Sequence, residues 1–317
     1  MLSPIALLFP GQGAQTVGMG RELKDSSPAA AALFARADAC LGRDLTKIMW
    51  EGPKEELTRT ANCQPALYLH GLAALAAVRE SLDNRAAEFD AAIVGAAGLS
   101  LGELTAHAAA GTVDFENGLK LVERRGELME EACRLAGGTM AALIGGDAPS
   151  ALALAEACGV EVANFNSPGQ YVLSGAVDGI TKAVAQARDR GFRKAVPLDV
   201  AGAYHSRLME PARTRLAEAL ATTPMDAPRF PVIANFSAEP VRDPVTARDL
   251  LTKQVTGSVR WIGSIERLAK EFGVMLFLEL GPGAVLAGLV GRIVGAAEVI
   301  SIGDPASVAK AAERLKA

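Results

Sequence analysis

The chain has 317 residues, of which 50% are hydrophobic and 21% are charged, a composition typical of a globular protein and not of a disordered one. This length favours about two domains. The net charge of −4 argues against nucleic acid as a partner, because phosphate binding needs clustered Lys and Arg.

The four cysteines lie far apart with no C-x-x-C spacing, so the sequence predicts neither a zinc site nor a disulfide scaffold. A reducing compartment, the cytoplasm, is therefore expected. The apolar N-terminal run lacks the basic residues of a secretory signal and predicts a first buried strand. The apolar segment 272–290 has the length of a membrane span, but Glu279 and two glycines interrupt it, which favours a strand, a turn and a helix. No membrane association is expected.

Strand-like and helical patterns alternate along the chain, which indicates an α/β fold. In the first part we expect a strand at 5–9, helices at 28–41 and 64–82, a strand at 91–97 that enters a sharp turn at Gly98, a helix at 101–110, and a long helix capped by Asp114 that runs to about residue 135.

The middle of the chain has the order β-α-β-β-α-β, the ferredoxin-like split βαβ unit. Its expected elements are strand 139–144, helix 149–157, strands 160–165 and 171–174, helix 178–190 and strand 194–198. Afterwards the α/β pattern resumes, with strands at 232–235, 274–280 and 299–302. The sequence thus predicts an α/β hydrolase-like catalytic domain with a parallel sheet (1–136 and 201–317) and an inserted ferredoxin-like subdomain (137–200).

The segment Gly98–Gly102 has the sequence G-x-S-x-G between an expected strand and an expected helix. In that setting a tight turn presents the serine hydroxyl at the strand tip, so Ser100 is the candidate nucleophile. The N–H of Leu101 would lie at a helix N-terminus, where a developing oxyanion is favoured. A chance Gly-x-Ser-x-Gly in a Gly-rich chain is the alternative, and the strand–turn–helix context argues against it.

A serine nucleophile needs a base, and the chain has three histidines. His107 lies roughly 10 Å further along the same helix as Ser100, out of reach of the hydroxyl. His70 lies in an apolar helical stretch and is expected to be a helix core residue. His205 follows an expected strand in a glycine-containing loop, so it is the preferred base. The group that orients it stays open among three candidates: Asp199, Gln254 and Glu279.

Two further positions have local patterns of interest. Gly11–Gly13 follows the first strand but lacks the Gly-Lys-Ser/Thr of a phosphate loop and the third glycine of a dinucleotide fingerprint. A turn that lets Gln12 approach a bound carbonyl oxygen is the better interpretation. Arg125, on the long helix, either lies on a solvated face or forms a fork for a substrate carboxylate, and local pattern does not decide between them.

Six segments in order resemble the malonyl-CoA:acyl carrier protein transacylases of fatty-acid synthesis. They are FPGQGAQ (9–15), GLSLGE (98–103), RG (125–126), NFNSPGQ (164–170), GAYHS (202–206) and ELGPG (279–283). The resemblance covers nearly the whole chain, and the family fold, a hydrolase-like domain that carries a ferredoxin-like subdomain, agrees with the expected elements.

The resemblance implies a role for each matching position. Ser100 would carry malonyl as an ester and His205 would activate it. Gln12 and the Leu101 backbone would bind the oxyanion, Arg125 the malonyl carboxylate, and Gln254 would orient His205 through a carbonyl oxygen. Malonyl-CoA and phosphopantetheinylated acyl carrier protein would be the partners of a monomer, with neither a cofactor nor a metal.

Two positions depart from the common family pattern. Many members have histidine where this chain has Leu99, and phenylalanine is commoner at Tyr204. A branch of free-standing bacterial and plastid-type enzymes is similar to this chain in having leucine before the serine. Three rival functions remain open: transfer of another acyl group or to a polyketide carrier protein, a serine hydrolase, and a catalytically silent module that binds carrier protein.

Overall fold

The computed structural model of the chain describes residues 2–317 and contains two sheets. The larger sheet has six strands in the order β10-β9-β1-β2-β7-β8, and neighbours run parallel except for the short β7–β8 pair at one edge. Its strands are β1 (Ile5–Phe9), β2 (Ile93–Gly98), β7 (Val232–Ile233), β8 (Pro240–Val241), β9 (Leu276–Leu280) and β10 (Glu298–Ile302).

Helices pack on both faces of this sheet, and the side chains of β1 alternate between them. Ile5, Leu7 and Phe9 join a core that includes α5 and α8, whereas Ala6 and Leu8 pack with α13 and α14. Such alternation into two cores explains why the strand is apolar throughout. The helices of this part are α1 (Arg21–Ser26), α2 (Pro28–Leu41), α3 (Leu45–Glu51), α4 (Lys54–Thr58), α5 (Thr60–Ser81), α6 (Ala86–Ala92), α7 (Leu101–Ala110), α8 (Phe115–Ala136), α11 (Glu210–Thr222), α12 (Pro244–Gln254), α13 (Trp261–Lys270), α14 (Val285–Ile293) and α15 (Pro305–Lys316), with 3₁₀ turns at Asp83–Arg85 and Arg207–Met209.

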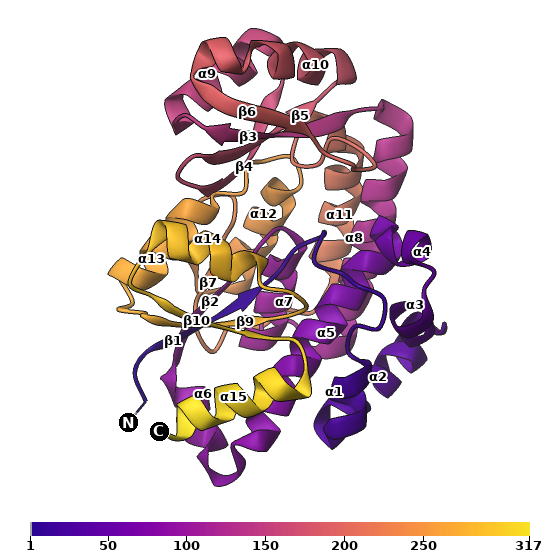
Figure 1. Cartoon of the computed structure of the whole chain (residues 1–317). Helices are drawn as coiled ribbons and strands as arrows, with labels where there is room; N and C mark the ends of the chain where they lie inside the picture. Colours follow the sequence, from indigo (N-terminus) through magenta and orange to yellow (C-terminus); the bar gives the residue numbers. More distant parts are fainter. Residues whose placement is uncertain (1) are drawn as a thin grey trace.

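The smaller sheet is antiparallel and lies at one end of the molecule, with two helices on its outer face (Figure 1). Its strand order is β4-β5-β3-β6, the order of a ferredoxin-like β-α-β-β-α-β unit. The elements are β3 (Thr139–Gly145), α9 (Ala148–Cys158), β4 (Glu161–Ser167), β5 (Gln170–Gly175), α10 (Val177–Gln186), a 3₁₀ turn at Arg188–Arg190 and β6 (Phe192–Pro197). The predicted fold class is confirmed.

Backbone hydrogen bonds connect the antiparallel sheet to the segment that precedes α13. Val259, which precedes α13, donates to the carbonyl of Ala163 at 2.8 Å and accepts from the N–H of Phe165 at 2.9 Å. Strand β4 is therefore tied to the large part of the chain, so side chains at its end have fixed positions relative to the parallel sheet. None of the helices between residues 2 and 317 is long and apolar enough to span a bilayer.

Candidate active site

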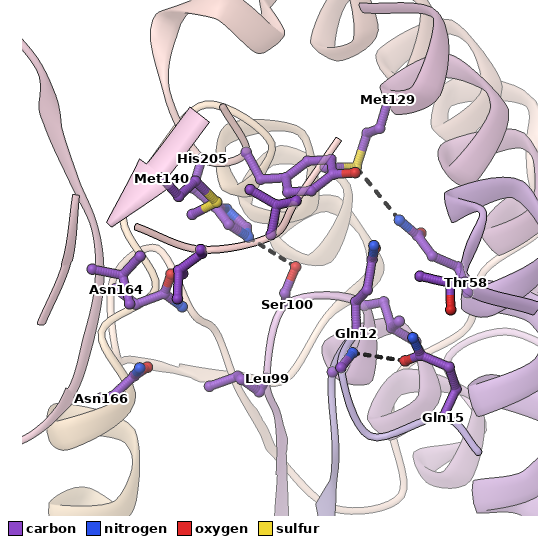
Figure 2. Close-up of a pocket in the computed structure, with 18 of the residues that line it drawn as sticks. Gln12, Gln15, Thr58, Leu99, Ser100, Met129, Met140, Asn164, Asn166 and His205 are labelled. Atoms are coloured by element: carbon purple, nitrogen blue, oxygen red, sulfur yellow. Dashed lines mark hydrogen bonds between the residues drawn. The ribbon is translucent and has the colours of Figure 1, made fainter. Parts of the chain in front are cut away.

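Ser100 occupies the tight connection between β2 and α7. Its φ of 56° and ψ of −108° place the strain of this turn on the serine itself. The flanking glycines are needed for close packing of the backbone. A Cβ at Gly98 would lie 1.9 Å from the backbone of Gly102, and one at Gly102 would lie 2.2 Å from the carbonyl oxygen of Phe9. The G-x-S-x-G spacing thus lets strand, turn and helix approach closely while the serine side chain projects into a pocket (Figure 2).

His205 faces Ser100 across this pocket, with the serine Oγ 2.8 Å from the histidine Nε2 (Figure 2). The other ring nitrogen, Nδ1, lies 2.8 Å from the main-chain carbonyl oxygen of Gln254. Because a carbonyl can only accept, Nδ1 carries the proton and Nε2 is the acceptor for the serine hydroxyl. The arrangement can therefore move a proton from Oγ to Nε2.

The protonation state of His205 suits that task. Its side chain is 4% exposed, and burial together with the nearby Arg125 guanidinium lowers its pKa to about 4. The imidazole is neutral at pH 7 and available as a base. Its backbone also has a positive φ of 57°, so both members of the pair are held in an uncommon conformation.

Arg125 points into the same pocket from α8, a helix capped by the side chain of Asp114. The guanidinium is buried and donates to the side-chain oxygens of Gln64 (2.8 Å), Gln254 (2.9 Å) and Ser100 (3.1 Å). Burial lowers its pKa to about 10, with partial compensation from a nearby carboxylate, so the group remains a cation at pH 7. Of the two interpretations of the sequence, the structure excludes the solvated face, because the Arg125 guanidinium is buried at the pocket.

Gln254, at the end of α12, contacts nearly every part of the site. Its main-chain carbonyl orients His205, while its side-chain Oε1 accepts from Arg125. The side-chain Nε2 donates to the carbonyl of Ser100 at 2.8 Å and to the Glu103 carboxylate at 2.7 Å. Of the three candidates for orienting His205, only Gln254 lies in that position. Asp199 is exposed at the pocket rim, and Glu279 caps α14 by accepting from the N–H groups of Leu286 and Ala287.

Sequence reasoning missed two residues below the serine turn. Asn235, after β7, accepts from the N–H of Ser100 through Oδ1 at 2.7 Å and donates to the carbonyl of Gly98 at 2.8 Å. Glu103, one turn into α7, accepts from the N–H of Asn235 at 3.0 Å. The signal for Glu103 was an acidic residue in a helix, 101–110, that has no other Asp, Glu, Lys or Arg, whereas nothing local marked Asn235.

Gln12 and Leu101 both line the pocket beside Ser100. Strand β1 pairs with β2 so that Phe9 is opposite Gly98, which brings the loop after β1 beside the serine turn. Among residues 2–317 the N–H of Leu101, the first residue of α7, has no hydrogen-bond partner. A free N–H at a helix N-terminus can bind an anionic oxygen.

The pocket around these residues has a volume of about 250 Å³ and is lined by strands of the antiparallel sheet and by loops and helices of the larger part of the chain. Met140 and Asn164 come from the antiparallel sheet, and Leu99 lies below Ser100 in the view of Figure 2. Tyr204 also lines the pocket, and its hydroxyl lies 2.8 Å from the Oγ1 of Thr60. A small acyl group fits this space.

The other two histidines lie outside the pocket. His107 is buried, with Nδ1 3.1 Å from the Oγ1 of Thr112 at the end of α7, and His70 is buried in the middle of α5. Within the described part of the chain, no group of three or more His, Cys, Asp or Glu side chains is arranged to hold a metal ion.

An α/β fold that presents a serine–histidine pair in a pocket is typical of enzymes that form acyl-serine intermediates. An acyl transferase domain family model matches residues 6–304. The malonyl CoA-acyl carrier protein transacylase of Bacillus subtilis is 39% identical over 320 residues, which cover 99% of this chain and 98% of that protein. This chain belongs to the family of malonyl CoA-acyl carrier protein transacylases, as the ordered segments of the sequence predict.

Solved structures agree with this assignment. The acyl-carrier-protein-S-malonyltransferase of Bartonella henselae has a TM-score of 0.92 and 37% identity, covering 99% of this chain and 100% of that one. A malonyl-transacylase in complex with its type II PKS acyl-carrier protein has a TM-score of 0.89 and 36% identity, covering 98% of this chain and 100% of that one.

Proposed function

We propose that the protein transfers the malonyl group of malonyl-CoA to the phosphopantetheine thiol of acyl carrier protein for fatty-acid synthesis, through a malonyl ester of Ser100. The observation that carries this proposal is the 2.8 Å contact between Ser100 Oγ and His205 Nε2 with a buried guanidinium 3.1 Å from the same Oγ. The full-length similarity to transacylases of this activity supports it.

In the first half-reaction, Ser100 Oγ attacks the thioester carbonyl carbon while its proton passes to His205 Nε2. The carbonyl oxygen becomes an oxyanion, which the N–H of Leu101 and Gln12 would stabilise. The C–S bond then breaks, and CoA leaves as a thiol with the proton from His205. The main-chain carbonyl of Gln254 holds the imidazole in the tautomer that both proton transfers need.

The second half-reaction reverses these steps with a different thiol. The phosphopantetheine thiol gives its proton to His205 and attacks the malonyl ester. The ester C–O bond breaks, and Ser100 recovers its proton from the imidazolium. A thiol must reach the ester before water does, so the mouth of the pocket has to admit the phosphopantetheine arm.

Arg125 would select malonyl over acetyl. A malonyl group carries a carboxylate one methylene beyond the carbonyl that is attacked, and Arg125 already lies within hydrogen-bond distance of the attacking oxygen. A planar guanidinium can bind that carboxylate with two parallel, charge-assisted hydrogen bonds.

Two further assignments are part of the proposal. We infer that residues 137–200 form a subdomain inserted between residues 1–136 and 201–317, supported by the separate antiparallel sheet and its own apolar core. We also place the protein in the cytoplasm. Its cysteines are free thiols, a state that a reducing compartment maintains.

Product analysis with malonyl-CoA and the holo and apo forms of a carrier protein tests the proposal. The expected result is malonyl-carrier formation with the holo form alone. Rapid release of CoA and free malonate without carrier protein would contradict it and indicate a hydrolase.

A further inference from the structure

Glu103 is a buried carboxylate to which the proposed mechanism gives no task. It lies on α7 below Ser100, its side chain is 0% exposed, and it is not among the residues that line the pocket. Burying a carboxylate is costly unless other groups compensate it. One of its oxygens, Oε1, has no hydrogen-bond partner within residues 2–317, so the compensation comes through the other oxygen.

The second oxygen, Oε2, accepts two hydrogen bonds from residues far away in the sequence. Gln254 donates its Nε2 at 2.7 Å, and Asn235 donates its main-chain N–H at 3.0 Å. One carboxylate oxygen therefore joins the end of α12 to the loop after β7. Both partners contact Ser100 directly, Gln254 at its carbonyl and Asn235 at its N–H.

The contact with Gln254 also decides which way that amide points. With Nε2 facing the Glu103 carboxylate, Oε1 must face the opposite side, where it accepts from Arg125. The reverse orientation would place an NH₂ against a guanidinium and a carbonyl oxygen against a carboxylate, so both hydrogen bonds of the amide would be lost. Glu103 thus determines the face that Gln254 presents to Arg125.

Charge gives a second connection between these residues. The Arg125 guanidinium is buried, and its hydrogen-bond partners Gln64, Gln254 and Ser100 are all neutral. Glu103 is the carboxylate on the far side of the Gln254 amide. Burial raises its own pKa to about 7, and above that pH its negative charge raises the pKa of Arg125 against the effect of burial. The Gln254 amide lies between the Arg125 guanidinium and the Glu103 carboxylate, and this arrangement stabilises both buried charges.

We propose that Glu103 is a positioning residue for the acyl transfer: it fixes the Gln254 amide and the Ser100 turn, and supplies the negative charge that balances Arg125 while no substrate carboxylate is bound. This inference rests on the proposed function. Glu103 would act through Gln254, Asn235 and Arg125, without touching the substrate.

Two substitutions separate the hydrogen bonds from the charge. Glu103→Gln is nearly isosteric and retains one oxygen that can accept from both partners, but removes the charge. Glu103→Leu removes charge and acceptor. Glu279→Gln is the matched control, because Glu279 is equally buried and likewise accepts main-chain hydrogen bonds, yet caps α14 outside the pocket.

The measurements are kcat and KM for malonyl-CoA and acetyl-CoA, with the folded fraction of each variant from circular dichroism. Glu103→Leu should lower kcat for malonyl about tenfold to a hundredfold with KM nearly unchanged, the loss expected for one or two misplaced charge-assisted contacts. Glu103→Gln should recover most of kcat. It should also raise the malonyl-to-acetyl ratio of kcat/KM several-fold, because the substrate carboxylate becomes the sole counter-ion of Arg125. Glu279→Gln should leave kcat and the ratio at wild-type values.

The inference is overturned if the Glu103 variants lose only thermal stability, while kcat per folded molecule and the malonyl-to-acetyl ratio of kcat/KM stay at wild-type values. Glu103→Gln retains the side-chain volume and a hydrogen-bond acceptor. Its malonyl-to-acetyl ratio of kcat/KM therefore tests the inference even if Glu103→Leu does not fold. A wild-type protein that transfers no malonyl would instead overturn the proposed function, and this inference with it.

Discussion

Ser100 and His205 both have positive φ values, near 56° and 57°, although neither is glycine. Such conformations cost of order 1–3 kcal/mol each and persist only where surrounding contacts hold them. Asn235 and Gln254 provide those contacts at the serine turn. The strain and its restraint keep Oγ and Nε2 at hydrogen-bond distance before any substrate arrives, which is the preorganisation that acyl transfer requires.

Arg125 is the residue whose substitution should change selectivity. In the free protein its guanidinium retains three neutral acceptors, so an acetyl group in the pocket does not leave it without partners. The gain from a malonyl carboxylate is therefore about one or two charge-assisted hydrogen bonds, or roughly 1.5–3 kcal/mol. Arg125→Ala should lose about tenfold to a hundredfold in kcat/KM for malonyl-CoA relative to acetyl-CoA.

Two related variants complete this experiment. Arg125→Lys should recover little, because one ammonium cannot serve two glutamines and a carboxylate in fork geometry. Arg124→Ala is the matched control, since Arg124 is a half-exposed neighbour that pairs with Glu127 outside the pocket. If Arg125→Ala weakens both substrates equally, the guanidinium supports the structure and not the malonyl carboxylate.

At the scale of single elements, local signals located several boundaries well. Helices 28–41 and 101–110 begin and end where the sequence predicts. Helix α5 instead begins at Thr60, before the expected start at residue 64. Pro65 leaves the carbonyl of Ala61 without its helical donor, and Arg43 donates to that oxygen at 3.4 Å. A side chain distant in sequence thus permits the extra turn, which local pattern could not reveal.

The cap of α8 should affect stability without affecting the chemistry. Asp114 accepts from the N–H of Asn117 at 2.8 Å, and Arg125 lies about three turns further along. Asp114→Ala should lower the free energy of unfolding by about 1 kcal/mol, and Asp114→Asn should restore most of it. Urea unfolding measures both variants. A large fall in kcat/KM for Asp114→Ala in the folded protein would show instead that the helix start positions Arg125.

Over the whole molecule, the sequence predicted the two kinds of sheet, the serine turn and the choice of histidine. These features depend on local patterns: a buried strand before G-x-S-x-G, or a β-α-β-β-α-β order. Local patterns left open which group orients His205, because the partners are 49 residues apart and the main chain of Gln254 provides the oxygen; only the family resemblance indicated Gln254. Asn235 was missed for the same reason, since its partner Ser100 is 135 residues away.

Buried ionisable groups make the stability of the whole fold depend on pH. Burial lowers the pKa of His70 to about 4. Its unfolded form binds a proton near pH 6.5 while the folded form does not, so this contribution to stability is present above pH 6.5 and is lost as the pH falls toward 4. His107 and His205 act in the same direction. Glu103, whose pKa burial raises to about 7, acts in the opposite direction, because its folded form takes up the proton first.

Replacing His70 isolates one of these contributions. Between pH 7 and pH 5, His70→Leu should lose about 2 kcal/mol less unfolding free energy than the wild type, because the variant lacks a group that the unfolded chain protonates. Urea unfolding at the two pH values gives the difference. Malonyl transfer should stay near wild type, since His70 lies outside the pocket. Equal losses in both proteins would mean that the folded state protonates His70 as readily as the unfolded chain does.

Intact-mass measurement of the wild type and Ser100→Ala, first with malonyl-CoA and then with holo carrier protein, tests the central claim most directly. The wild type should gain one malonyl group, which peptide mapping places on Ser100, and lose it again when the carrier is added while the carrier gains the same mass. Ser100→Ala, with an unchanged circular dichroism spectrum, should gain nothing. A malonyl adduct on another residue of Ser100→Ala, or a wild-type adduct that water removes as fast as the carrier does, would contradict the account.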